Sequence, residues 1–381
     1  MFRSINHCCK ASTFLILGLF CLALPSVAEQ PAKPTPTFDI TTLTDQLQSP
    51  WSLAFLPSGD ILIAEKVGAL RLFDGKTLSA PIAGVPQALV RSQGGFQDLV
   101  LHPDYEKNGW VYLSFAWGER SANGTRLVRG RIKQGAFVDQ EVLFTAEPLK
   151  NTPVHYGARL AFLPDNTLVM AVGDGFDFRE SAQKTDSLLG KFVRLNDDGS
   201  IPKDNPFFTK KDYHPAIYSL GHRNPQGVAY DPVRQQLFAN EHGPQGGDEI
   251  NILAPGKNYG WPIITYGRDY SGASITPFTE YEGMEQPLVN WTPSIAPSSL
   301  VVYNADLFPA FKGDLLSSAL KAKEVRWVQM QGEKPVAEVS LFGELNARIR
   351  AVYVGSEGAL YLLTDGDKGS LLKVTPTVKA P

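Results

Sequence analysis

One phrase recurs along the sequence, and it restricts the fold more than composition does. An apolar strand is followed by a turn rich in Gly, Pro, Asp or Asn and then by a second apolar strand. Six copies start near residues 51, 97, 158, 226, 298 and 349, so successive copies lie 46 to 72 residues apart. Repeats of about 40–50 residues built from short strands are typical of β-propeller blades. The pattern predicts an all-β six-bladed β-propeller with four-stranded antiparallel blades.

A pair of β-sandwiches is the alternative, but six similar copies favour one closed ring. Helix content should be low, because no long segment keeps an apolar period of 3.6 residues. The segment Phe38–Thr44 reads as a strand before the first copy, and we expect it to join the last blade and close the ring. The propeller would then span residues 38–378. The longest loops are expected to carry function, and they are predicted at 173–215, 240–290 and 320–348.

The N-terminal segment has the pattern of a signal peptide over residues 1–28. Two basic residues precede an apolar run over 14–24, and the small residues Ser26 and Ala28 mark a cleavage site. A membrane anchor and a lipoprotein modified at Cys21 are the alternatives. The run is short for a membrane span, and a bulky residue precedes this cysteine. We expect a periplasmic or secreted protein whose mature form has no cysteine, because all 3 lie in this leader.

Charge excludes one class of partner. The chain has 36 Lys and Arg against 39 Asp and Glu, a net charge of −3, which provides no basic field for nucleic acid. Removal of the leader makes the balance more acidic, so contact with an anionic membrane is not expected, nor is stable membrane insertion. Residues 29–37 are rich in proline and predict a linker.

Three regions concentrate Gly, Pro and Asp. They are 221–227 (GHRNPQG), 240–249 (NEHGPQGGDE) with 258–262 (NYGWP), and 291–299 (WTPSIAPSS). Such density suggests backbone carbonyls turned outward, which together with Asp248 and Glu249 are the hard oxygen ligands that calcium takes. The alternative is a set of solvated turns.

Isolated basic residues stand at predicted strand ends: Arg223, Lys321, Arg348 and Arg350. In a strand, residues 348 and 350 share one face. Two adjacent guanidinium groups repel each other unless an anion lies between them, and a ligand with several carboxylates would meet that need. The alternative is a pair of surface arginines.

Three histidines lie in segments expected at the channel mouth: His155, His222 and His242. Their spacing does not match a zinc site. A neutral histidine is a natural general base near neutral pH. The residues alone leave the choice among the three open.

Taken together, the motifs GHRNPQG, EHGP with GDEIN, NYGWP and APSS resemble the soluble quinoprotein glucose/sorbosone dehydrogenases, and within them the aldose sugar dehydrogenase branch. The resemblance runs in order from about residue 49 to 374. It implies a six-bladed propeller that holds pyrroloquinoline quinone (PQQ) and Ca²⁺ at the channel mouth. PQQ carries three carboxylates and an ortho-quinone.

The resemblance assigns roles residue by residue. The cofactor-binding residues would be Arg223, Asn224, His242, Ser294, Lys321, Arg348 and Arg350. The carbonyls of Gly243 and Pro244 would hold the catalytic calcium. A second calcium would map to Glu249, Tyr259, Thr265, Asp269 and Glu285, with Tyr259 and Thr265 acting through their carbonyl oxygens.

The implied reaction oxidises the C1 hydroxyl of an aldose to a lactone. His155 would take the hydroxyl proton while the C1 hydride moves to PQQ, with calcium and Arg223 stabilising the charge that forms. Gln93 matches a substrate-side glutamine, and an external acceptor would receive the electrons. Relatives commonly carry Asp before the histidine, where this chain has Val154. The loss of that carboxylate is expected to lower the basicity of His155 or to alter substrate choice.

Two other classes share a propeller scaffold: a calcium-dependent lactonase or esterase, and a non-catalytic ligand-binding propeller. The lactonase or esterase would not need Lys321, Arg348 and Arg350 to converge on one ligand. Lactone hydrolysis without PQQ would indicate the first class, and quinone binding without turnover would indicate the second.

Overall fold

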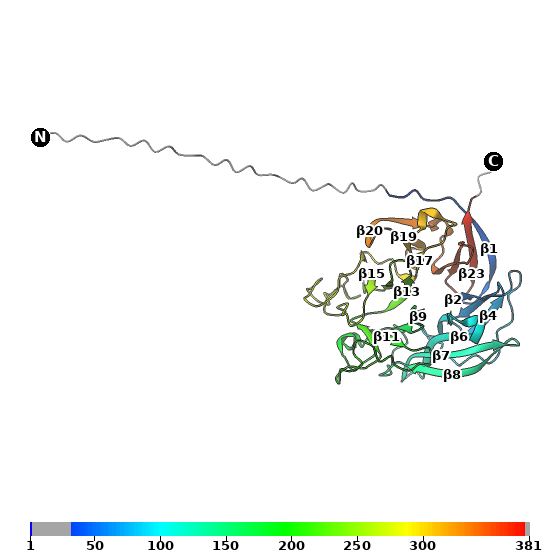
Figure 1. Ribbon diagram of the computed structural model, residues 1–381, viewed down its shortest axis with the longest axis horizontal. Coiled ribbons are helices and arrows are strands. Elements are labelled where there is room, and N and C mark those ends of the chain that lie inside the picture. Colours follow the sequence, from blue (N-terminus) through cyan, green and yellow to red (C-terminus); the bar gives the residue numbers. More distant parts are fainter. Residues whose placement is uncertain (2–31, 378–381) are drawn as a thin grey trace. The chain divides into compact units, whose positions relative to one another are not determined.

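Short apolar strands joined by turns build six antiparallel sheets around a central axis (Figure 1). The computed structural model describes residue 1 and residues 32–377. The signal-peptide prediction over 1–28 therefore lies outside the described residues except for its first residue. Within the described part, no helix is long and apolar enough to cross a membrane.

The blades follow one another in sequence order. The first contains β2 (Pro50–Phe55), β3 (Ile61–Glu65) and β4 (Ala69–Phe73), and the second contains β5 (Phe96–Leu101), β6 (Trp110–Gly118), β7 (Asn123–Lys133) and β8 (Ala136–Thr145). The third contains β9 (Gly157–Phe162), β10 (Leu168–Val172), β11 (Lys191–Leu195) and β12 (Ile217–Leu220), and the fourth contains β13 (Pro225–Asp231), β14 (Gln236–Glu241), β15 (Asp248–Leu253) and β16 (Val289–Trp291). The fifth contains β17 (Pro297–Tyr303), β18 (Asp314–Ala319), β19 (Glu324–Gln331) and β20 (Lys334–Leu341). The last contains β21 (Ile349–Val354), β22 (Leu360–Thr364), β23 (Gly369–Pro376) and β1 (Phe38–Leu47).

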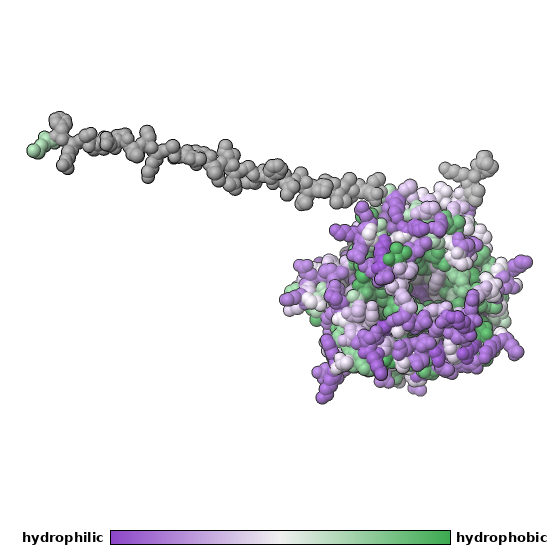
Figure 2. Space-filling view, in the orientation of Figure 1, coloured by the Kyte–Doolittle hydropathy of each residue, from purple (hydrophilic) through white to green (hydrophobic). Residues whose placement is uncertain are grey.

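The six-bladed propeller and the low helix content are confirmed. The helical elements described are single turns: α1 (Tyr105–Asn108), η1 (Arg179–Gln183), η2 (Pro309–Phe311) and η3 (Gly343–Leu345). The first strand of each blade packs beside that of the next, and β21 packs against β2, which completes the ring. Figure 2 shows a hollow near the middle of the ring, with both hydrophobic and hydrophilic residues around it. The first blade departs from the prediction, since it has three strands rather than four.

The apolar core lies between neighbouring blades. One cluster joins Leu53 and Ile63 of the first blade to Ala351, Leu363 and Leu371 of the last. Each blade thus buries both of its faces against neighbours, and no single central core is needed.

The N-terminal strand closes the ring as expected, because β1 pairs antiparallel with β23, from Phe38 opposite Pro376 to Leu47 opposite Gly369. The ring of Phe38 also packs against Phe308 and Phe342.

Deletion of residues 38–43 should therefore unfold the whole ring cooperatively. The deletion would expose the edge of β23 and remove buried aromatic contacts. Circular dichroism during heating measures the loss. A soluble truncate that melts at the temperature of the intact chain would contradict this expectation.

Two of the three predicted functional loops are long connections. They are residues 173–190 and 196–216 around β11, and residues 254–288 between β15 and β16. The third prediction, 320–348, is wrong. That region is mostly the regular hairpin of β19 and β20. In β20, exposed and partly buried residues alternate, so this outer strand lacks a continuous apolar run.

Candidate active site at the channel mouth

His155 is held by a buried carboxylate. It lies just before β9 with φ 53°, in the left-handed region. Its Nδ1 is 2.7 Å from Oδ1 of Asp174, which directly follows Gly173 after β10. The other oxygen of Asp174 accepts a hydrogen bond from Trp261 Nε1 at 2.8 Å. An ionised carboxylate can only accept, so we assign the ring proton to Nδ1, which leaves Nε2 as the basic nitrogen.

The surroundings of the pair favour a neutral His155 and an ionised Asp174. Burial lowers the pKa of His155, and the charge of Arg223 adds to this effect, while the hydrogen bond that His155 donates to Asp174 opposes it. Burial alone would raise the pKa of Asp174, but His155 and Arg223 together bring it below the ordinary value. His155 is therefore neutral at pH 7.

Asp174 was missed in the sequence. The substitution of Val154 for the acid of relatives suggested that His155 lacks a carboxylate, and the structure supplies one from the end of another strand. The available signal was Gly173-Asp174-Gly175, an acid between two glycines immediately after a buried strand.

The side chain of Gln93 contacts the backbone of His155. Its Oε1 accepts a hydrogen bond from the backbone N–H of His155 at 2.8 Å, and the backbone N–H of Gln93 donates to Pro153 O at 3.1 Å. The predicted substrate-side glutamine is therefore adjacent to the base.

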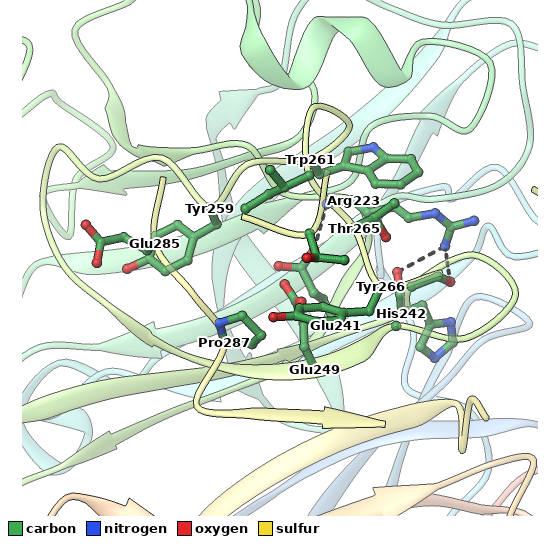
Figure 3. A pocket seen from close by; sticks show the side chains of 14 residues that line it. Arg223, Glu241, His242, Glu249, Tyr259, Trp261, Thr265, Tyr266, Glu285 and Pro287 are labelled. Atoms are coloured by element: carbon green, nitrogen blue, oxygen red, sulfur yellow. Dashed lines mark hydrogen bonds between the residues drawn. The ribbon is translucent and has the colours of Figure 1, made fainter. Parts of the chain in front are cut away.

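Arg223 ties the two polar motifs together. Its Nη1 donates to the carbonyls of His242 at 3.0 Å and Gly243 at 2.7 Å (Figure 3). The Gly243 oxygen, predicted for calcium, thus accepts from a guanidinium group. The Pro244 oxygen, also predicted for calcium, lies 3.4 Å from Ser294 Oγ.

The other predicted cofactor residues surround two neighbouring cavities that share His242 and Ala296. Lys321, Ser294 and Pro244 line a cavity of about 550 Å³. Arg348, Arg350, Asn224 and Gln93 line one of about 180 Å³. The structure thus brings residues from four blades to one mouth of the channel.

Arg348 and Arg350 have a counter-ion within the protein, Asp365. The inference from sequence that this pair needs an anionic ligand between the two guanidinium groups is therefore corrected. Asp365 accepts from Arg348 Nε at 2.8 Å and from Arg350 Nη2 at 2.7 Å. Burial lowers the pKa of Arg350 to about 10, and Asp365 opposes that change. Lys321 and Arg268 line the larger cavity together with Asp248, so the basic residues around the two cavities still outnumber the acids Asp365 and Asp248.

These cavities fit a polar anion. Trp51 Nε1 and Gln97 Oε1 are buried and have no hydrogen-bond partner within residues 32–377, and both residues line the smaller cavity. An unpaired buried polar atom is costly. The cationic walls and the Trp51 donor match a ligand with carboxylates and carbonyls, whereas Gln97 Oε1 is an acceptor and would need an N–H or O–H donor on the ligand.

The three histidines differ in their surroundings. His242 Nε2 lies 2.7 Å from Pro297 O, and burial, with help from Arg223, lowers its pKa to about 3. His222 is 0% exposed and lies between Ser219 and Glu241. Among the three, His155 alone combines a carboxylate partner on one ring nitrogen with no hydrogen bond on the other within the described residues. The structure favours His155 as the base.

Four of the five residues predicted for a second calcium line one small cavity of about 20 Å³ (Figure 3). This space suits a single ion or water. The four residues are Glu249, Tyr259, Thr265 and Glu285. The structure does not bring the fifth, Asp269, to this cavity. Asp269 lies beside Arg179 at 3.7 Å and lines a neighbouring cavity.

Charge in the small cavity is unbalanced. Burial and the nearby Glu241 raise the pKa of Glu249, whereas Glu285 is paired with Lys257 at 2.8 Å. Within the described residues, no group of three or more His, Cys, Asp or Glu side chains could hold a metal ion. A calcium ion would therefore need backbone oxygens, as the resemblance implies.

The fold and the site together define a propeller with a histidine–carboxylate base beside cationic cavities at one channel mouth. The chain belongs to the glucose/sorbosone dehydrogenase family, whose model matches residues 47–373. Aldose sugar dehydrogenase YliI of Escherichia coli (strain K12) is 41% identical over 372 residues, which cover 96% of this chain and 98% of that protein.

Solved structures agree. The apo-form of the soluble aldose sugar dehydrogenase from Escherichia coli has a TM-score of 0.86 at 41% identity, covering 90% of this chain and 100% of that one. The PQQ-bound form of aldose sugar dehydrogenase from Streptomyces coelicolor has a TM-score of 0.73 at 28% identity, covering 90% and 99%.

Proposed function

We propose that this protein is a PQQ-dependent aldose dehydrogenase that oxidises the C1 hydroxyl of a sugar to a lactone. The observation that carries the proposal is the His155–Asp174 pair, placed beside cationic cavities at the mouth of a family propeller. The reaction removes two electrons and two protons from the sugar. When bound, PQQ supplies an ortho-quinone that takes up the electrons, and an external acceptor later receives them.

The chain's own residues would divide the work. Lys321, Arg348 and Arg350 would face the carboxylates of PQQ, with Asn224, His242 and Ser294 along the same cavities. Calcium would bind the Gly243 and Pro244 carbonyls, and because a carbonyl oxygen has two lone pairs, Gly243 could hold calcium while it still accepts from Arg223. These residues fit the group because they offer cations and oxygens where the cavities lie.

His155 Nε2 would take the proton of the C1 hydroxyl. Asp174 would hold the ring in the required tautomer and stabilise the positive charge that forms on it. Arg223 would stabilise negative charge beside its guanidinium group, and Gln93 would contact the sugar next to the base.

Reconstitution tests the function. The purified chain with PQQ and Ca²⁺ should reduce a dye in the presence of aldoses, and several sugars should be compared. The absence of a spectral change on adding PQQ would reject the cofactor. Hydrolysis of lactones without PQQ would favour the hydrolase alternative.

The pH dependence follows from the base. The pKa of His155 is lowered from 6.5, chiefly by burial. A lowered pKa keeps the ring neutral, and therefore active, at pH values where an ordinary histidine is already protonated. We expect kcat/KM to fall only below pH 6.5, as His155 gains its proton. A profile of kcat/KM against pH whose acid limb has its midpoint above 6.5 would contradict this assignment.

We also propose export to the periplasm or the medium, on the evidence of the leader sequence. N-terminal sequencing of the mature protein should begin at Glu29.

A further inference from the structure

A buried hydrogen-bonded chain lies directly behind Arg223. Ser219 Oγ is 2.9 Å from His222 Nε2, and His222 Nδ1 is 2.9 Å from Glu241 Oε1. The second oxygen of Glu241 accepts the backbone N–H of Arg223 at 2.6 Å. We call Ser219, His222 and Glu241 the support chain.

The order serine, histidine, acid is that of a hydrolase triad, but burial excludes a nucleophilic role. Ser219 and His222 are each 0% exposed, and Glu241 is 4% exposed. The ring of His222 is enclosed by Phe192, at 4.8 Å between ring centroids, and Tyr259, at 4.7 Å. A substrate cannot reach Ser219. The support chain must therefore act through the group that Glu241 contacts, which is the backbone N–H of Arg223.

Glu241 joins two segments that must be aligned at the mouth. It is the last residue of β14 and is followed by His242 and Gly243, whose carbonyls accept from the Arg223 guanidinium. Its carboxylate accepts a hydrogen bond from the backbone N–H of Arg223, which lies in the turn after β12. Arg223 is therefore fixed to the β14 end at its backbone and at its side chain.

The same turn also reaches the base. The amide of Asp174 donates to the carbonyl of Arg223 at 2.8 Å, so a shift of this turn would disturb the partner of His155 as well. Glu241 is itself held in place by Asn251 on β15, whose Nδ2 donates to Glu241 Oε1 at 3.3 Å.

We propose that Glu241, supported by His222 and Ser219, is a positioning residue that sets the Arg223 guanidinium against the Gly243 carbonyl for catalysis. This role rests on the proposed dehydrogenase function. Both oxygens of Glu241 face donors, so an amide nitrogen in either position would oppose a backbone N–H or a histidine nitrogen.

The test is Glu241→Gln in the PQQ- and calcium-loaded enzyme. We expect kcat to fall about 10- to 100-fold, as for other supporting partners of an active-site group, with little change in KM for the sugar. The matched control is Glu65→Gln. Glu65 is another buried acid at the end of a strand, and it accepts the amide of Gln48 at 2.7 Å in the first blade. It should keep the wild-type kcat.

A double-mutant cycle separates positioning from general damage. If Glu241 acts through Arg223, the pair Arg223→Ala with Glu241→Gln should turn over as slowly as Arg223→Ala alone. Multiplied losses in the double variant would overturn the proposal.

A readout independent of turnover is the crystal structure of the variant without cofactor. The contact of 2.7 Å from Arg223 Nη1 to Gly243 O should be lost in Glu241→Gln. An unchanged contact would overturn the positioning role even if the wild-type chain proved not to be a dehydrogenase. Lack of dye reduction by the wild type together with a lost contact would reject only the proposed function.

If Glu241→Gln does not fold, Ser219→Ala shortens the support chain without placing a donor against Arg223. One lost hydrogen bond predicts about a fivefold lower kcat. Wild-type kcat with an unmoved Arg223 would contradict the proposal.

Discussion

His155→Ala should lose at least about 10²-fold in kcat while it retains PQQ, since this is the low end of the contribution of a general base. The side chain lies at the base position and is not one of the cationic groups around the cofactor cavities. Dye reduction measures the rate, and the absorbance of bound PQQ after gel filtration measures retention.

The matched control for this variant is His214→Ala. His214 lies on a different surface, beside Tyr213 and Lys211, and its replacement should leave the rate unchanged. Near-normal turnover in His155→Ala would remove His155 from its role. Loss of PQQ from this variant would instead make it a binding residue.

Asp174→Asn should be nearly as damaging, with a loss of about 10²-fold or more in kcat. The amide cannot supply the charge that stabilises a protonated His155. Its nitrogen can also donate to Nδ1, which would move the ring proton to Nε2 and block the base. The acid limb of the rate profile should move to lower pH, because an anionic partner of the imidazolium is lost.

Asp314→Asn is the control for this second variant. Asp314 is equally buried and accepts a tryptophan Nε1 at 2.8 Å, as Asp174 does, but from Trp327 in the fifth blade. A similar loss of thermal stability in both variants, with loss of kcat only in Asp174→Asn, would support the assignment. Equal rates in the two variants would refute it.

The fold was largely predictable because its signal is local. Each hairpin carries its own turn residues and apolar strands, so six blades could be counted without knowing any long-range contact. The outer strands were harder. Lys334–Leu341 alternates exposed and partly buried residues, and this pattern hid a strand inside a predicted loop.

The site was predictable only where a motif is continuous in sequence. Arg223 and Gly243 stand in motifs, whereas Asp174 and Asp365 act on residues that other strands deliver. The Asp365 contact had a local basis, because the hairpin of β21 and β22 pairs Ile349 with Thr364 and thereby places Arg348 next to Asp365. The contact between Asp174 and His155 has the same kind of local basis, because the hairpin of β9 and β10 pairs Gly157 with Val172 and the Gly173 amide donates to the Tyr156 carbonyl. It was missed because both residues lie just beyond the strand ends, where the apolar pattern stops.

The pairing of β1 with β23 has a consequence for biosynthesis. The last blade needs a strand from near residue 38 and another that ends at residue 376, so all six blades must be synthesised before the ring can be closed. Until then the nascent chain is an open arc with an unpaired edge at each end. Such an arc offers strand edges to chaperones and to other copies, and the late arrival of β23 ends that exposure.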